Sequence, residues 1–169
     1  MTSFYKIFAL SFLALLTAGI AGCGYNTKSL YTSAYKTVAV SIFDNKTFRK
    51  EVEFRLTEAV DKNIEARTPY KISSDKKYAD TVLTATIVDI QELPLSRRFE
   101  TNLPRETQIV ITVDFSWRDA KTGRQLVTEK SFHRGATEIP ELGERIGDAQ
   151  QLAIEELAYA IVSQMQKDF

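Results

Sequence analysis

Two stretches of the chain space their apolar residues three or four positions apart, which is the period of an amphipathic helix. The first covers residues 48–66, and Pro69 prevents its continuation. Asn45 or Thr47 is expected to cap its start. The second covers residues 141–169 and closes the chain. The predicted buried stripes are Val52, Leu56, Ala59, Val60 and Ile64 in the first helix, and Ile146, Ala149, Ala153, Leu157, Ala160, Ile161 and Met165 in the second.

A strict alternation of apolar and polar residues predicts a strand at residues 107–119. One face carries Ile109, Ile111, Val113, Phe115 and Trp117, and the other carries Gln108, Thr112, Asp114 and Ser116. This pattern indicates a sheet with one covered face and one polar face. Residues 124–135 then return as an antiparallel partner, and Gly123 suits the left-handed conformation that the turn requires.

Three further strands are expected before this hairpin. Residues 36–43 carry apolar side chains on both faces, which favours a central strand. Residues 69–74 form a short strand, and residues 80–93 are rich in Val, Ile and Thr. The alternation slips near Val88, where we expect a bulge. Residues 94–106 contain two prolines and have no period, so they are expected to form a long loop.

This order of elements favours an α+β fold, because a sheet with one apolar face is covered most simply by helices on that face. We predict two helices packed on one face of a mixed, mostly antiparallel sheet of four to five strands. The sequence has no internal repeat or low-complexity tract, so residues 37–169 are expected to form one domain.

The N-terminal segment has the features of a secretory signal. Lys6 is followed by an uncharged run from Ile7 to Ala21, which is too short to span a bilayer but fits the apolar region of a signal peptide. Residues 1–22 are therefore expected to be removed. Residues 23–36, rich in Gly, Asn, Ser and Thr, are expected to connect the cleavage site to the domain.

Cys23 is the only cysteine, so no disulfide within the chain is possible. A lone thiol after an apolar run could be a core residue, a nucleophile or a site of lipid attachment. The stretch Ile20-Ala21-Gly22-Cys23 resembles the bacterial lipobox, which implies that Cys23 carries acyl chains such as palmitate and anchors the protein in a membrane. Two or three acyl chains on one residue give stable attachment. Gly24 in place of Asp favours the outer membrane under the enterobacterial sorting rule.

The chain offers little for catalysis. It contains 22 basic and 22 acidic residues, which gives no field that would favour nucleic acid. His133 is the only histidine and is expected to have a structural or solvated role. No nucleophile elbow, P-loop or HExxH motif occurs, and Glu155 and Glu156 are adjacent on a helix and so point in different directions. We predict a protein that is not an enzyme and that uses no metal or cofactor.

The densest local charge is in the stretch SRRFETNLPRE, which contains Arg97, Arg98 and Arg105. One interpretation is a solvated loop. The other is a loop that contacts an anion or a protein partner, because Arg binds phosphate and carboxylate groups with two parallel hydrogen bonds.

Several segments together resemble the LPS-assembly lipoprotein family LptE. They are the lipobox followed by CGY, then KTVAVSIFDNKTF, EFRLTEAVDKNI, YADTVLTATIVDI and VDFSWRDAKTGRQL. The resemblance implies a small α+β sandwich that plugs the outer-membrane β-barrel LptD, assists its assembly and helps to deliver lipopolysaccharide to the cell surface. Cys23 is the residue that matches a functional position of the family.

Two other functions remain open at this stage. One is a lipoprotein subunit of a secretion channel like CsgG, which would need membrane-spanning hairpins. The other is a lipoprotein that activates a cell-wall synthase. The partner captured from solubilised membranes would distinguish all three.

Overall fold

The computed structural model describes residues 31, 34–97, 99, 104–138 and 146–166. Both predicted helices and all five predicted strands are present in these ranges, together with a two-residue strand, β2. The elements are β1 (Thr37–Val40), β2 (Asp44–Asn45), α2 (Val52–Arg67), β3 (Lys71–Ile72), β4 (Thr81–Arg97), β5 (Pro104–Asp119), β6 (Gln125–Glu138) and α3 (Ile146–Ser163).

The strands form one mixed sheet in the order β3-β1-β4-β5-β6, and β2 pairs with the side of β4 away from β5. The antiparallel pairings are β4 with β5 and β5 with β6, whereas β1–β3, β1–β4 and β2–β4 are parallel. The expectation of a mostly antiparallel sheet was therefore wrong in this detail. Helix α2 carries the chain back along the sheet after β1, so β3 starts at the same end as β1 and must run parallel to it.

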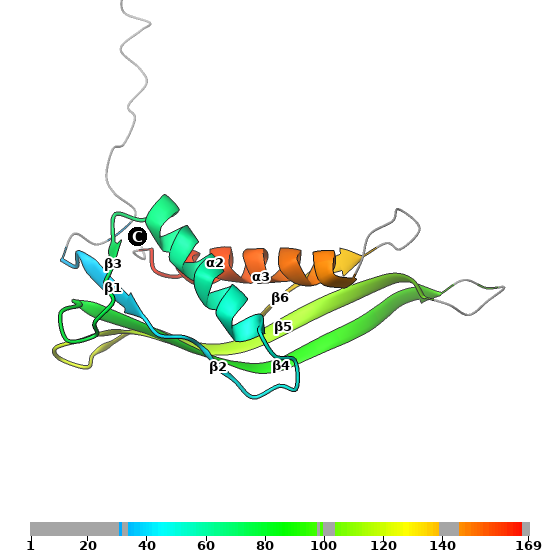
Figure 1. Cartoon of the computed structure of the whole chain (residues 1–169), viewed down its shortest axis with the longest axis horizontal. Helices are drawn as coiled ribbons and strands as arrows, with labels where there is room; N and C mark the ends of the chain where they lie inside the picture. The colour runs from blue at the N-terminus through cyan, green and yellow to red at the C-terminus, as the bar shows by residue number, and fades with distance from the viewer. Residues whose placement is uncertain (1–30, 32–33, 98, 100–103, 139–145, 167–169) are drawn as a thin grey trace, which may run out of the picture.

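Both helices cover the same face of the sheet and leave the other face open (Figure 1). The five inward residues predicted on β5, Ile109 to Trp117, are all buried, as the alternation required. They pack against Leu56, Val60 and Ile64 of α2 and against the buried stripe of α3. That stripe contains the predicted Ala149, Ala153, Leu157, Ala160 and Ile161, and also Ile154, Ala158 and Val162. The predicted Met165 is buried just beyond the end of the helix, and the side chain of the predicted Ile146 lies outside the described part of the chain.

The start of α2 differs from the prediction. Its N-cap residue is Glu51, in the left-handed region with a φ of 73°, and no side chain caps the helix. Asn45 instead organises the preceding loop, because its Oδ1 accepts from the Thr47 N–H at 2.8 Å and its Nδ2 donates to Glu53 Oε2 at 2.7 Å. The side chain is turned to the loop and to the first turn of the helix, so it does not occupy the cap position.

The predicted loop at residues 94–106 is largely strand. Strand β4 continues to Arg97 and β5 begins at Pro104, with Arg97 opposite Pro104 in the register. Pro94 is tolerated because β2 pairs with β4 only at Thr86 and Ile87, so beyond that point the outer edge of β4 needs no backbone donor. The expected bulge is confirmed, since the register shifts between Ile87 and Asp89.

The predicted strand at residues 36–43 is central in the sheet, between β3 and β4, but it ends at Val40. Ile42 is consequently exposed, while Phe43 is buried beneath α2. The Phe43 N–H donates to the Thr57 Oγ1 at 3.1 Å, which connects this segment to the helix.

Candidate functional site

The predicted basic residues belong to an arm formed by the far ends of β4 and β5, from Gln91 to Arg97 and from Pro104 to Val110. This arm extends beyond the ends of both helices (Figure 1). Arg97 is exposed at the end of β4, and pairing with β5 brings its backbone close to that of Arg105. The side chain of Arg105 lies outside the described part of the chain, as do Arg98 and Cys23.

The arm also exposes large apolar side chains. Leu93 and Leu95 are 40% and 52% exposed, and Phe99 is fully exposed just beyond Arg97. These three side chains are not part of the hydrophobic core, whose last buried residue toward the arm on β5 is Ile109. An arm with both apolar and guanidinium groups can contact a ligand or partner that itself combines apolar and anionic groups.

The open face of the sheet carries mainly polar side chains, with Leu93 and Val110 among them near the arm. Near the arm it forms a hollow of about 440 Å³. His133 at its edge is exposed, and its Nδ1 lies 3.1 Å from the Ser131 carbonyl oxygen. Farther along, a shallow hollow of about 410 Å³ is lined mainly by hydroxyl and charged groups. The first hollow is lined by Gln91, Leu93, Gln108, Val110, Thr112, His133 and Gly135, and the second includes Asp44, Thr84, Thr86, Asp114, Ser116, Thr128, Glu129 and Lys130.

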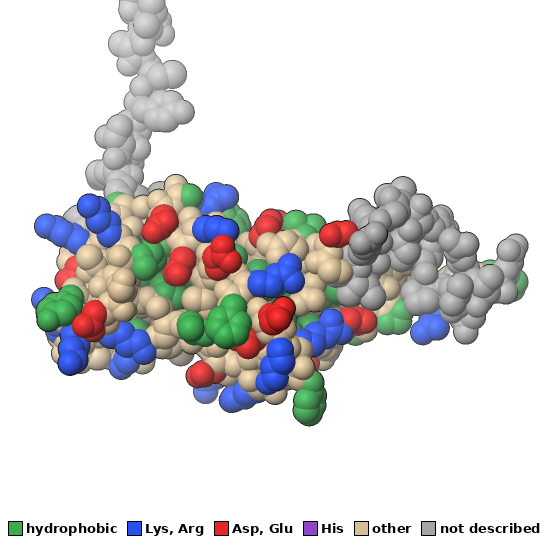
Figure 2. Space-filling model, viewed as in Figure 1, with side chains coloured by type: hydrophobic (Ala, Val, Ile, Leu, Met, Phe, Trp, Pro, Cys, Tyr) green, Lys and Arg blue, Asp and Glu red, His purple; other side chains and the backbone are tan. Residues whose placement is uncertain are grey.

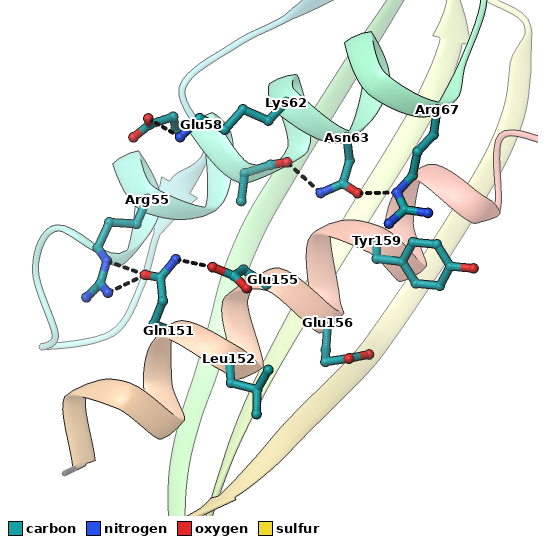
Figure 3. A pocket seen from close by; sticks show the side chains of 11 residues that line it. Arg55, Glu58, Lys62, Asn63, Arg67, Gln151, Leu152, Glu155, Glu156 and Tyr159 are labelled. Atoms are coloured by element: carbon teal, nitrogen blue, oxygen red, sulfur yellow. Dashed lines mark hydrogen bonds and ion pairs between the residues drawn. The ribbon is translucent and has the colours of Figure 1, made fainter. Parts of the chain in front are cut away.

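A third depression, of about 440 Å³, lies between α2 and α3 on the outer surface (Figure 3). Its polar side chains bond to one another through the neutral Gln151: Arg55 Nε donates to Gln151 Oε1 at 3.1 Å, and Gln151 Nε2 donates to Glu155 Oε1 at 2.8 Å. At its other end the Arg67 guanidinium lies over the Tyr159 ring, 4.5 Å from the centroid. This mutual pairing joins the two helices and leaves no constellation of a nucleophile and a base.

Asp61 is the one carboxyl among the described residues whose pKa is strongly displaced. Burial and the nearby Glu65 raise the pKa of Asp61 to about 6. Its Oδ1 is buried and has no hydrogen-bond partner in the described part of the chain. The described residues hold no group of three His, Cys, Asp or Glu side chains suited to a metal ion. Their helices include none that is long and apolar enough to cross a bilayer.

A family model for LptE, described as lipopolysaccharide assembly, matches residues 35–169. The chain belongs to the LptE family. This match covers the whole described domain from Tyr35 onward, and it confirms the resemblance seen in the sequence motifs. No curated protein sequence matches this LptE-family chain.

Solved structures share the fold of this LptE-family domain at low sequence identity. The hypothetical protein CT253 from Chlamydia trachomatis is 11% identical, with a TM-score of 0.56 over 77% of this chain and 95% of that one. Lipoprotein B from Nitrosomonas europaea is 13% identical, with a TM-score of 0.54 over 85% and 94% of the two chains. PelC from Paraburkholderia phytofirmans, solved as a dodecamer, is 14% identical, with a TM-score of 0.53 over 83% and 96%. These similarities establish the fold alone.

Proposed function

We propose that this protein is a non-catalytic lipoprotein of lipopolysaccharide assembly that plugs the outer-membrane barrel LptD and assists its assembly. The observation that carries the proposal is the family match over residues 35–169. Membership supports a general role in lipopolysaccharide assembly. We further propose that the partner is the LptD barrel, that the protein is located at the outer membrane and that acyl chains anchor it there.

The open face of the sheet supports a barrel partner. The lumen of an outer-membrane barrel is polar, so a protein inside it must present polar side chains. Thr84, Thr86 and Ser116 on this face, with Asp114 and Lys130, meet that requirement. The groove on the helical face is also lined mainly by polar side chains, among them Arg55, Gln151 and Glu155, which are connected by hydrogen bonds.

Cys23 is proposed as the site of lipid attachment. The lipobox-like sequence and the apolar run before it support this role. Changing Cys23→Ala should move the protein out of the membrane fraction and abolish labelling by radioactive palmitate. Continued labelling of the variant would contradict the assignment.

Arg97, Arg98 and Arg105 are proposed to contact lipopolysaccharide through its lipid A phosphates. The exposed position of Arg97 beside Leu95 and Phe99 supports this, because lipid A combines phosphates with acyl chains. Replacing Arg97→Glu and Arg98→Glu should weaken lipopolysaccharide binding by the purified protein. The matched control is Lys46→Glu with Lys50→Glu in the β2–α2 loop. If the arm variant bound lipopolysaccharide and LptD as well as the wild type does, the arm would be a solvated segment with no part in binding.

Depletion of the protein tests the function as a whole. We expect lipopolysaccharide to be lost from the cell surface and LptD to co-purify with the protein from detergent-solubilised outer membranes. Normal surface delivery with a correctly assembled barrel would contradict the proposal. Capture of a cell-wall synthase, or of a ring made only of copies of this chain, would favour one of the other two functions.

A further inference from the structure

Seven basic residues from separate segments lie at the end of the domain opposite the arm, and we name this surface the basic end patch. It is formed by the segment before β1, the start of β3, the β3–β4 loop, the end of β5 and the β5–β6 turn. Figure 2 shows Lys and Arg side chains gathered at this end, on the left of the view. The residues are Lys36, Lys71, Lys76, Lys77, Arg118, Lys121 and Arg124, and all are exposed.

Backbone hydrogen bonds hold these segments together. The Lys71 N–H donates to the Lys36 carbonyl oxygen at 2.9 Å, which places the start of β3 beside the segment before β1. The Ala120 N–H donates to the Asp80 carbonyl oxygen at 2.8 Å, which joins the β5–β6 turn to the β3–β4 loop. The patch is thus a fixed surface of the fold, although its members are up to 88 positions apart in the sequence.

The acidic residues of this end are engaged by the backbone. Asp80 accepts hydrogen bonds from the N–H groups of Lys36 and Thr37 at 2.9 and 3.2 Å, and the Lys36 bond is the main reason that its pKa is lowered. Asp119 accepts two N–H bonds of the β5–β6 turn, and Asp75 accepts one from Lys77. Glu65 and Arg67 at the end of α2 add one charge of each sign. The carboxylates of Asp75, Asp80 and Asp119 stay negative, but the seven basic residues of the patch outnumber them, so the end has an excess of positive charge.

The basic side chains are available to an external partner. Lys36, Lys71, Lys76 and Lys77 form no ion pair with any residue that the structure describes. Tyr78 follows Lys77 in the chain and is 81% exposed. A ring with a polar hydroxyl is suited to the boundary between lipid and water.

The N-terminal segment joins the domain at this same end. Tyr31 is only 8% exposed, and its ring contacts that of Tyr70 with 5.8 Å between centroids. Tyr35 packs against Trp117 at 6.2 Å. Eight positions separate Cys23 from Tyr31. A chain extends at most about 3.6 Å per residue, so Cys23 lies within about 29 Å of Tyr31.

We infer that the basic end patch docks on the anionic phospholipid headgroups of the membrane in which Cys23 is anchored. The inference rests on the lipid attachment proposed above, which brings this end close to a bilayer. Five of the seven residues are Lys, whose compact charge on a flexible stem suits dispersed phosphates on a flat surface. Basic residues near an anionic bilayer are attracted over about one Debye length.

Energy transfer from Trp117 tests the orientation in the full acylated chain. Trp117 is the only tryptophan and lies within this end, against Tyr35 and Tyr70. The protein is reconstituted into vesicles of phosphatidylcholine, with or without phosphatidylglycerol, that carry a trace of dansyl-labelled lipid. We expect higher transfer in the anionic vesicles, and we expect salt to remove the difference. Equal transfer in both vesicles at low salt would overturn the inference.

Two charge-reversal variants complete the test. Lys76→Glu, Lys77→Glu and Lys121→Glu together should lower transfer in anionic vesicles to the value in neutral ones. The control combines Lys46→Glu, Lys50→Glu and Arg134→Glu, which change the net charge equally at exposed positions outside the patch, and it should behave like the wild type. Equal effects of the two variants would overturn the inference, since only net charge would then matter.

Vesicle flotation separates this inference from the proposed anchor. Wild-type chain that floats with both vesicle types and shows the composition-dependent transfer supports both. Chain that floats with anionic vesicles alone supports the patch and contradicts lipid attachment. Chain that floats with both but shows no composition dependence contradicts the patch alone, and chain that floats with neither contradicts both.

Discussion

The Tyr35 hydroxyl donates a hydrogen bond to Asp119 Oδ2 at 3.1 Å, joining the segment before β1 to the β5–β6 turn. The same hydroxyl accepts from Arg124 Nη2 at 3.3 Å. Backbone N–H groups of the turn, Thr122 first, lower the pKa of Asp119, and the Tyr35 hydroxyl contributes to the same shift. Tyr35 therefore fixes the point where the N-terminal segment meets the domain.

Replacing Tyr35→Phe should lower the free energy of unfolding by about 1 kcal/mol, because it removes the hydroxyl and leaves the ring against Trp117. Urea denaturation measures the change. Tyr78→Phe is the matched control, because this exposed hydroxyl forms no hydrogen bond with any residue that the structure describes. Equal stability of the two variants would show that the Tyr35 hydroxyl contributes nothing.

Thr57 is a buried polar residue whose hydroxyl forms hydrogen bonds with two backbone groups. Its Oγ1 accepts from the Phe43 N–H at 3.1 Å and donates to the Glu53 carbonyl oxygen at 2.7 Å. Thr57→Val should destabilise the protein by about 1–3 kcal/mol, because it leaves the buried Phe43 N–H without a partner. Thr57→Ser keeps the hydroxyl and should cost less. A valine variant as stable as the serine variant in urea denaturation would contradict this account.

Gly123 lies in the β5–β6 turn with a φ of +71°, and an added Cβ would meet nothing within 4 Å. Gly123→Ala should therefore destabilise the protein through backbone conformation alone, by about 1 kcal/mol. Gly123→Asn should recover part of the loss, because Asn adopts the left-handed region more readily. Thermal unfolding of the two variants makes the comparison, and an alanine variant with the melting temperature of the wild type would refute it.

Asp61 should make the stability depend on pH. Its folded pKa of about 6 lies above the unfolded value, so the native state binds the proton more tightly. The resulting stabilisation is complete below about pH 4 and is lost as the pH rises through 6. At pH 7, Asp61→Asn should be more stable than the wild type by about 1 kcal/mol, a value reduced from the full shift because the side chain is only partly buried.

Urea denaturation from pH 4 to pH 8 tests the effect of Asp61. The advantage of Asp61→Asn should shrink toward zero at the acid end. Asp44→Asn, at an exposed position on β2, controls for the loss of one negative charge. A constant difference between Asp61→Asn and the wild type across the whole range would rule out titration of Asp61 as its cause.

Local patterns determined the elements of this protein. The spacing of Val52, Leu56, Val60 and Ile64 predicted α2, and the alternation from Ile109 to Trp117 predicted the buried face of β5. A helix and a strand each repeat over a few residues, so their apolar stripes are visible in a short window. The lipobox-like motif and the strand and hairpin motifs likewise sufficed to identify the family.

Apart from the β5–β6 hairpin, which the sequence predicted, only the tertiary structure decided how these elements pair. The prolines at 94 and 104 predicted a loop, but β4 has a free edge where Pro94 lies and Pro104 begins β5. The parallel pairing of β1 with β3 and β4 depends on a helical crossover between them. The local charge around Arg97 was enough to propose it as a contact residue. That its backbone lies close to the backbone of Arg105 depends on the register between β4 and β5.

The basic end patch has no sequence signature, because its residues lie in separate short segments and the chain as a whole is neutral. The sequence by itself determined the helices, the principal strands and the family. The fold decided which charges share a surface, because hydrogen bonds between distant segments, such as Lys71 to Lys36 and Ala120 to Asp80, set that geometry.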